Sequence, residues 1–135
     1  MMICLDANCL IYLIEGNPIW NQKIVARLVR AKAIGDTVGV CDLVRAECLI
    51  GPLKTGNSRV LADYQRVFSN PIVQMLPVTP TVCERAAEIR VASAMKIKLP
   101  DALHLAAAMV HGCGLFLTND EELAVCAAIK VEVLT

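Results

Sequence analysis

Short runs of apolar residues alternate along the chain with longer stretches whose apolar positions recur every three or four residues. The short runs predict strands at residues 2–5, 37–40, 72–78, 114–117 and 131–134. The longer stretches predict helices near residues 7–16, 18–33, 43–50, 58–69, 79–95 and 101–111, with a further short helix beginning near residue 118. We therefore expect one α/β domain over residues 1–135, with a five-stranded, mostly parallel sheet flanked by helices on both faces.

Capping residues and breakers set the expected helix ends. Asn17-Pro18 and Thr79-Pro80 are N-cap and first-turn pairs, and Asp42 is placed to cap the helix that follows it. Gly51-Pro52 is expected to stop that helix, and Gly112 the last long one.

The composition narrows the class of protein. The 135 residues are 56% apolar, yet no apolar run reaches the roughly 18 residues needed to span a membrane. No basic residue precedes the first apolar run, as one would in a signal peptide. The seven cysteines have neither disulfide-framework nor zinc-site spacing, which indicates reduced, mostly buried thiols. We therefore expect a cytoplasmic protein that does not enter a membrane.

The net charge is zero, but the charges are unevenly distributed. Residues 21–100 hold 12 of the 13 basic residues and only six of the 13 acidic ones. A basic middle is compatible with a polyanionic partner such as nucleic acid, and equally with solvated helix faces.

Four carboxylates recur near the starts of helices, three of them close behind predicted strands: Asp6, Glu47, Asp101 and Asp120. The carboxyl ends of parallel strands share one edge of the sheet, so these side chains should converge there. Two carboxylates about 4 Å apart repel by roughly 4 kcal/mol at an effective dielectric near 20. A divalent cation would relieve that repulsion, and a site of oxygen ligands alone favours Mg²⁺ or Mn²⁺ over zinc.

Each of these acids also has a purely structural interpretation. Residues 118–121 match the pattern of a capping box, which would account for Asp120. Asp101 lies in a first helical turn, where the helix dipole favours a negative charge. Glu47 can be a surface residue paired with an arginine. Asp6 is hardest to explain structurally, because it directly follows a strand that should be buried.

Four motifs in order along the chain resemble the PIN domain, and most of all the VapC-type ribonuclease toxins of bacterial toxin–antitoxin pairs. The motifs are Asp-Ala-Asn at 6–8, Leu-Val-Arg-Ala-Glu at 43–47, Leu-Pro-Asp-Ala-Leu-His-Leu-Ala-Ala-Ala at 99–108 and Phe-Leu-Thr-Asn-Asp at 116–120. The resemblance implies Mg²⁺- or Mn²⁺-dependent RNA cleavage, a homodimer, and inhibition by a small antitoxin whose tail enters the active site.

Carried over residue by residue, the resemblance makes the acidic set catalytic: Asp6, Glu47, Asp101 and Asp120. Asp6 and Asp101 are the expected metal ligands, joined by Glu47 and Asp120 in a fuller shell. Asn8 and Thr118 match supporting polar positions, and Asn119 lies near them.

The chain departs from the pattern at two positions. Cys41 stands six residues before the glutamate, where many relatives have Ser or Thr, and Ala7 stands where Thr or Ser is common. Both departures reduce the hydrogen bonding around the ligands rather than the ligand set itself.

Several charged residues near these motifs have two interpretations. Arg45 can contact substrate phosphate, although a surface ion pair is favoured. His104 lies on the same helix face as Asp101 and is expected to be a hydrogen-bonded, partly buried histidine rather than a ligand. The lysines expected to contact an RNA backbone are Lys54, Lys96 and Lys98.

These observations favour a metal-dependent endoribonuclease acting on single-stranded RNA. A haloacid-dehalogenase-like phosphohydrolase would need a second aspartate two residues after Asp6, where Asn8 stands. A receiver-type signalling domain would need a buried lysine near the acids, which Lys96 and Lys98 fit poorly. A non-catalytic module that uses its acids to dock a basic partner tail remains the main alternative.

Overall fold

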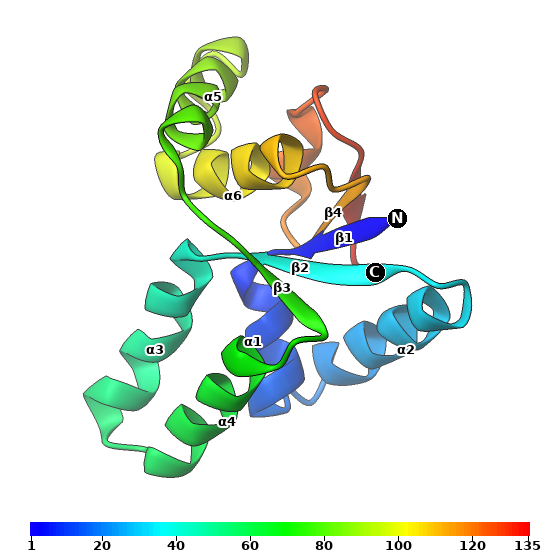
Figure 1. Ribbon diagram of the computed structural model, residues 1–135, viewed down its shortest axis with the longest axis vertical. Helices are drawn as coiled ribbons and strands as arrows, with labels where there is room; N and C mark the ends of the chain where they lie inside the picture. The colour runs from blue at the N-terminus through cyan, green and yellow to red at the C-terminus, as the bar shows by residue number, and fades with distance from the viewer.

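Strand and helix alternate along most of the chain, and the computed structural model describes all residues from 1 to 135 (Figure 1). The elements in order are β1 (Met2–Leu5), α1 (Ala7–Glu15), α2 (Trp20–Ala33), β2 (Thr37–Cys41), α3 (Leu43–Thr55), α4 (Ser58–Ser69), β3 (Val73–Leu76), α5 (Pro80–Ala92), α6 (Leu99–Val110), β4 (Leu115–Thr118), the 3₁₀ helix η1 (Glu121–Val125) and β5 (Val131–Val133). Every predicted element is present, and the expected α/β class is confirmed.

The sheet has five strands in the order β3-β2-β1-β4-β5, and every neighbouring pair is parallel. β1 lies at the centre, where Ile3 pairs with Val38 of β2 on one side and with Leu115 of β4 on the other. The strand order therefore reverses at β1, and parallel sheets bind ligands beyond the carboxyl ends of the strands at such a reversal.

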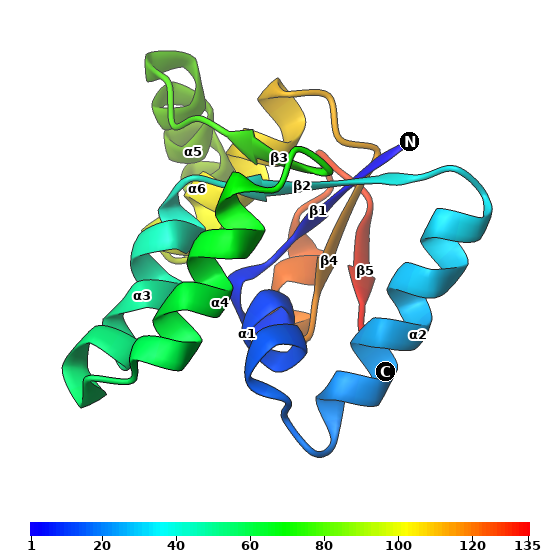
Figure 2. The same ribbon diagram turned by 60° about the horizontal axis from the view of Figure 1, so that its bottom comes forward.

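Helices cover both faces of the sheet. Figure 1 shows α5 and α6 on one side and α1, α2, α3 and α4 on the other, and Figure 2 shows α3 and α4 side by side. The central strand is buried on both faces, with Ile3 and Leu5 at most 2% exposed. Residues 104–108 of α6 are all fully buried, which places this helix in the core rather than on a surface. The acidic motif at the start of α6 is thereby fixed to the sheet.

The predicted end of α3 at Gly51-Pro52 is wrong. The helix continues through Pro52, which is buried, to Thr55. Gly56 ends it in the left-handed conformation (φ 68°), and its N–H donates to the Pro52 carbonyl. Burial of the proline ring offsets the loss of one backbone hydrogen bond, and the glycine provides the conformation that ends the helix.

Two predicted caps and one predicted helix end are also wrong. Asp42 makes no capping hydrogen bond and instead pairs with Arg45. The cap of η1 is Asp120 rather than Thr118, because the Asp120 side chain accepts the N–H of Glu122. α5 ends at Ala92 instead of near residue 95. The two residues after Ser93 adopt left-handed backbone conformations, which end the helix.

The cysteines are free, and six of the seven are buried, as the sequence predicts. None of the helices combines the length and apolar character needed to cross a membrane.

The N-cap of α5 yields the first test of the fold. The Thr79 hydroxyl oxygen accepts the N–H of Val82 at 3.2 Å. We expect Thr79→Ala to lower the free energy of unfolding by about 1 kcal/mol, because a helix N–H loses its partner. Urea unfolding of this variant beside Thr81→Ala, an exposed control in the same turn, measures the effect. Equal stabilities of the two variants would contradict the assigned cap.

Candidate active site

The four predicted acids come from four different elements and gather beyond the carboxyl ends of β1 and β4. Asp6 follows β1, Asp120 follows β4, Glu47 lies in α3 and Asp101 in the first turn of α6. Burial raises the pKa of Asp101, and the negative charges of Asp6, Asp120 and Glu47 raise it further against the opposing effect of His104. All four acids are thus close enough to interact electrostatically.

Asp6 is the buried floor of this cluster, at 5% exposure. One of its carboxylate oxygens accepts the N–H of Ala7 at 2.8 Å, and the other accepts the Thr118 hydroxyl at 2.6 Å. Its own N–H donates to the Leu117 carbonyl at 2.9 Å, which extends the pairing of β1 with β4 by one residue. The sheet itself therefore fixes the position of this carboxylate.

Thr118 links two of the acids. Its hydroxyl donates to Asp6 and accepts the N–H of Asp120 at 3.1 Å. A serine or threonine at this position therefore orients the Asp6 carboxylate and holds the backbone of Asp120 in place. The sequence indicates a supporting role for Thr118, and the structure supplies these two contacts.

Glu47 is held by His104, a partner that the sequence does not reveal. The His104 ring is fully buried, its Nε2 hydrogen-bonds to a Glu47 carboxylate oxygen, and its Nδ1 has no hydrogen-bond partner. Burial alone lowers the pKa of His104, but Cys41 and Glu47 raise it more, to about 10. Glu47 and Cys41 thus favour the charged form of the ring, which would partly compensate the acids around it. The only available signal was the three-residue spacing from Asp101 to His104.

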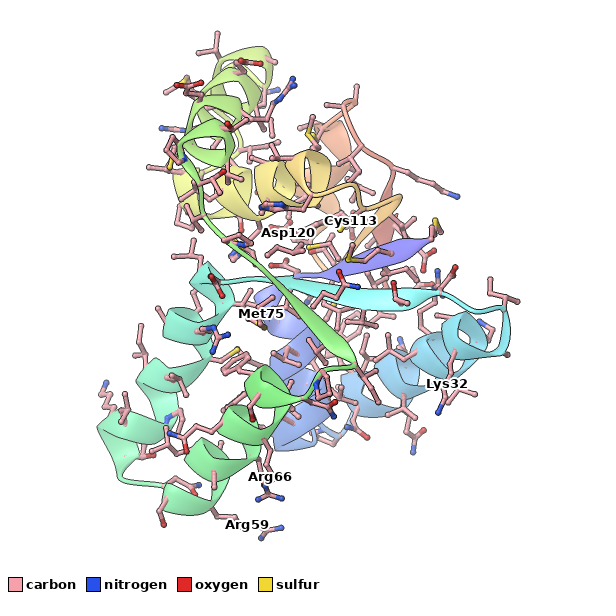
Figure 3. The ribbon with its side chains drawn as sticks, viewed as in Figure 1. Lys32, Arg59, Arg66, Met75, Cys113 and Asp120 are labelled. Atoms are coloured by element: carbon pink, nitrogen blue, oxygen red, sulfur yellow. The ribbon has the colours of Figure 1, made fainter.

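Asp101 differs from the other three acids because no protein group hydrogen-bonds to its carboxylate. It lines a small cavity of about 80 Å³ together with Asp120, Lys96 and Lys98. Figure 3 shows Asp120 in the middle of the molecule, between α6 and the sheet. Asp101 is therefore the carboxylate with the most freedom to bind a ligand.

The predicted amide residues form a second small network. Asn8 donates to the Asn119 side-chain oxygen at 3.5 Å, and the Asn119 amide donates to the Tyr12 hydroxyl at 2.7 Å. Tyr12 in turn stacks on Trp20, with ring centroids 5.7 Å apart. The exposed side of this network leaves the Asn8 amide accessible beside the acids.

Arg45 does not join the acids in this structure. Its guanidinium pairs with Asp42 at 3.0 Å and lies over the ring of Phe68, 5.3 Å from the centroid. The favoured interpretation of Arg45 as a surface ion pair is thus the arrangement that the structure shows.

The donor chemistry of the cluster fits a hard divalent cation, because its members offer carboxylate oxygens. Burial and, after it, the neighbouring carboxylates raise the pKa of Asp101, and a bound cation would favour its charged form. No three His, Cys, Asp or Glu side chains converge tightly enough to hold an ion as they stand. Glu47 uses one carboxylate oxygen to bond His104, and Asp120 uses one to cap η1, so each would bind an ion through its other oxygen.

The fold and the site together define the class of protein. It is a small α/β domain with a parallel sheet, and its carboxylate cluster lies where the strand order reverses and is suited to binding a cation. The chain belongs to the PIN domain family, whose model matches residues 3–129. A search of curated proteins finds no significant match.

Solved structures share this fold. The Rickettsia felis VapBC2 complex, bound to a promoter DNA fragment, matches with a TM-score of 0.82 at 18% identity over 100% of both chains. DNA-bound VapBC of Salmonella typhimurium matches at 0.80 and 19% identity, over 100% of this chain and 99% of that one. VapC20 of Mycobacterium tuberculosis, a sarcin–ricin loop cleaving toxin, matches at 0.73 and 17% identity, over 96% and 98%. The likeness to these toxin structures agrees with the resemblance seen in the sequence motifs.

Proposed function

We propose that this protein is a metal-dependent endoribonuclease that hydrolyses phosphodiester bonds in single-stranded RNA, and that it is the toxin of a toxin–antitoxin pair. The observation that carries the proposal is the gathering of four carboxylates from four elements, with three of them raising the pKa of the fourth. Such repulsion is costly in a site without a cationic ligand. VapC20, a sarcin–ricin loop cleaving toxin, has a similar fold.

In this proposal Asp6, Glu47 and Asp101 hold Mg²⁺ or Mn²⁺, and Asp120 completes the ligand set. The bound cation supplies a water of lowered pKa and neutralises charge on the phosphate. Thr118 keeps the Asp6 carboxylate turned toward the site through its 2.6 Å hydrogen bond. His104 holds Glu47 in place and adds one positive charge behind the acids.

The remaining polar residues orient the substrate in the same proposal. The Asn8 amide is exposed beside Asp6 and can contact a sugar or phosphate oxygen. Its hydrogen bond to the Asn119 side-chain oxygen orients it. Arg45 would reach a phosphate only by leaving Asp42, so we assign it no more than a peripheral contact.

We further propose a small antitoxin protein as partner, a homodimeric state, and a cytoplasmic location. VapBC2 and VapBC are described as complexes bound to DNA, and another structure of this fold is a toxin–antitoxin complex from Klebsiella pneumoniae (TM-score 0.72, 20% identity). A basic antitoxin tail would find a complementary surface in the four acids.

The test is cleavage of a mixed RNA pool by the purified protein in Mg²⁺, Mn²⁺ or EDTA. We expect cleavage that EDTA abolishes and added metal restores. Asp6→Asn should reduce the rate about 100-fold, since the amide keeps the hydrogen bond from Ala7 but removes the negative charge. Asp63→Asn, in an exposed ion pair on α4, is the matched control.

Three results would overturn the proposal. Unchanged cleavage by the Asp6→Asn protein would assign the activity to another site or to a contaminant. Metal binding without turnover of any RNA would favour the non-catalytic docking module. A covalent phosphate trapped on Asp6 would favour a phosphohydrolase instead.

A further inference from the structure

The loop between α5 and α6 has an unusual backbone. Ala94 and Met95 have φ values of +54° and +64°, and they are the only non-glycine residues with positive φ. Residues with a Cβ atom disfavour this region, and two in succession occur only where the surroundings impose the conformation. Strained backbone of this kind is concentrated at ligand-binding positions.

A dense set of contacts imposes this conformation. The Arg90 guanidinium donates to the carbonyls of Ile97 and Met95 at 3.0 and 3.4 Å. The Ser93 hydroxyl oxygen accepts the Ile97 N–H at 3.2 Å, and the Met95 N–H donates to the Arg90 carbonyl at 2.8 Å. Ile97 is 2% exposed and anchors the loop in the core. The loop is therefore held rigidly.

This rigid loop presents two lysines to the acidic site. Lys96 and Lys98 flank the buried Ile97 and line the same 80 Å³ cavity as Asp101 and Asp120. Both side chains are exposed, and neither makes an ion pair with a carboxylate. Two unpaired ammonium groups beside a cluster of acids are available for an anionic ligand.

We propose that Lys96 and Lys98 form a subsite for the backbone phosphates that flank the cleaved bond of single-stranded RNA; this rests on the proposed function. An acidic site repels a polyanion, and a cation held by the carboxylates acts only on the phosphate next to it. The neighbouring phosphates need their own positive charges. Lysine supplies them as point charges that do not read sequence.

The strained loop explains how flexible lysines can act as a subsite. The backbone between them is fixed by Arg90, Ser93 and the buried Ile97, so only the side chains themselves must be ordered when RNA binds. Pre-organised positioning raises affinity by reducing the entropy lost on binding.

The test uses RNA binding in the Asp6→Asn background, where cleavage does not consume the substrate. Fluorescence anisotropy of a labelled single-stranded oligonucleotide is measured across a salt series in Mg²⁺. We expect Lys96→Gln and Lys98→Gln each to weaken binding by about 5-fold at low salt and to reduce the salt slope by about 0.7. Lys32→Gln, an exposed lysine at the far end of α2, is the matched control (Figure 3).

A second pair of variants separates positioning from charge. Replacing Ala94 and Met95 by glycine removes the backbone strain, so the melting temperature should stay the same or rise. RNA binding should nevertheless weaken, because glycine lets the segment leading to Lys96 sample other conformations even though the anchors at Arg90, Ser93 and Ile97 remain. In the cleaving protein with wild-type Asp6, the lysine variants should raise KM and leave kcat nearly unchanged.

The outcomes distinguish this inference from the proposed function. If the parent protein binds RNA and the lysine variants match Lys32→Gln, the subsite is wrong and the nuclease proposal stands. If the parent neither binds nor cleaves any RNA, the proposed function fails and the subsite with it. If the lysine variants keep full RNA affinity but lose binding of an acidic peptide, the lysines serve a protein partner and the subsite is again wrong.

Discussion

Replacing Asp101 by asparagine is expected to abolish cleavage and at the same time to stabilise the fold. Asp101 is the one acid of the cluster whose carboxylate receives no hydrogen bond. It therefore stabilises the fold least and is the most free to bind a ligand. Its loss should reduce RNA cleavage about 1000-fold, as expected when a principal electrostatic contact of a transition state is removed.

The expected gain in stability follows from the raised pKa of Asp101. Burial comes first among its causes, and the charge of Asp6 comes next. Because the folded pKa lies above the unfolded value of 3.8, the folded state holds the proton more tightly. Stability from this group is present at low pH and is lost as pH rises from about 3.8 through the raised folded pKa. At neutral pH the ionised Asp101 carboxylate therefore destabilises the folded state, whereas the neutral amide of the Asp101→Asn variant does not.

Thermal unfolding at pH 7 and at pH 4 measures this effect. We expect the melting temperature of Asp101→Asn to exceed that of the wild-type protein at pH 7, with a smaller difference at pH 4. Mg²⁺ should raise the melting temperature of the wild-type protein and have little effect on the variant, because a ligand that binds only the folded state stabilises it. A lower melting temperature for the variant at pH 7 would show that Asp101 has a structural role that the contacts do not reveal.

The second large effect concerns His104 and pH. The pKa of His104 is about 10 in the folded protein, against an ordinary value of 6.5. The stability from this group is therefore fully present below about pH 6.5 and is lost as pH rises toward 10. The total effect is on the order of a few kcal/mol, since one unit of pKa corresponds to about 1.4 kcal/mol.

We therefore expect His104→Gln to be much less stable than the wild-type protein at pH 6, and the difference to shrink steadily up to pH 10. Urea unfolding at several pH values measures it, with His111→Gln as the matched control, since His111 bonds only to the Pro77 carbonyl. Burial also raises the pKa of Cys9 and Cys48 to about 12, so ionisation of these thiols changes the free energy of unfolding above pH 9. This change is the same in the wild-type protein and in His104→Gln, and it cancels from their difference. A pH-independent difference would mean that His104 is neutral in the folded state.

The sequence was sufficient to predict the fold class and the positions of the four acids at strand and helix ends, because both depend on local patterns; the catalytic roles of the acids stay a prediction. Strand runs and helical periodicity are visible residue by residue, and the acids stand at predictable strand and helix ends. The sequence was insufficient wherever a specific side-chain contact, local or distant, decides the outcome. Nothing near Ala94 and Met95 signals a helix end, because the backbone conformation there is fixed by Arg90 and Ser93.

At the site, the hydrogen bond expected of His104 is confirmed, whereas the capping box is not. The apparent capping box at residues 118–121 fails because the Thr118 hydroxyl oxygen accepts the Asp120 N–H and the Asp120 side chain caps η1. The Thr118 hydroxyl proton goes to Asp6, 112 residues away in the sequence. The role of His104 depends on Glu47, 57 residues away. Local sequence patterns identify the residues of such a site, and tertiary contacts determine which of these residues hydrogen-bond to each other.

The pairing of β1 with β4 has a consequence for when the site comes into existence. Asp6 is synthesised 112 residues before Thr118, but its fixed position requires both Leu117 and Thr118. Contacts between segments so far apart in sequence form late, because the intervening chain must first be ordered. A nascent chain emerging from the ribosome therefore carries the carboxylate but not the site. The translation machinery is therefore not exposed to an assembled acidic site until residues 117 and 118 have been made.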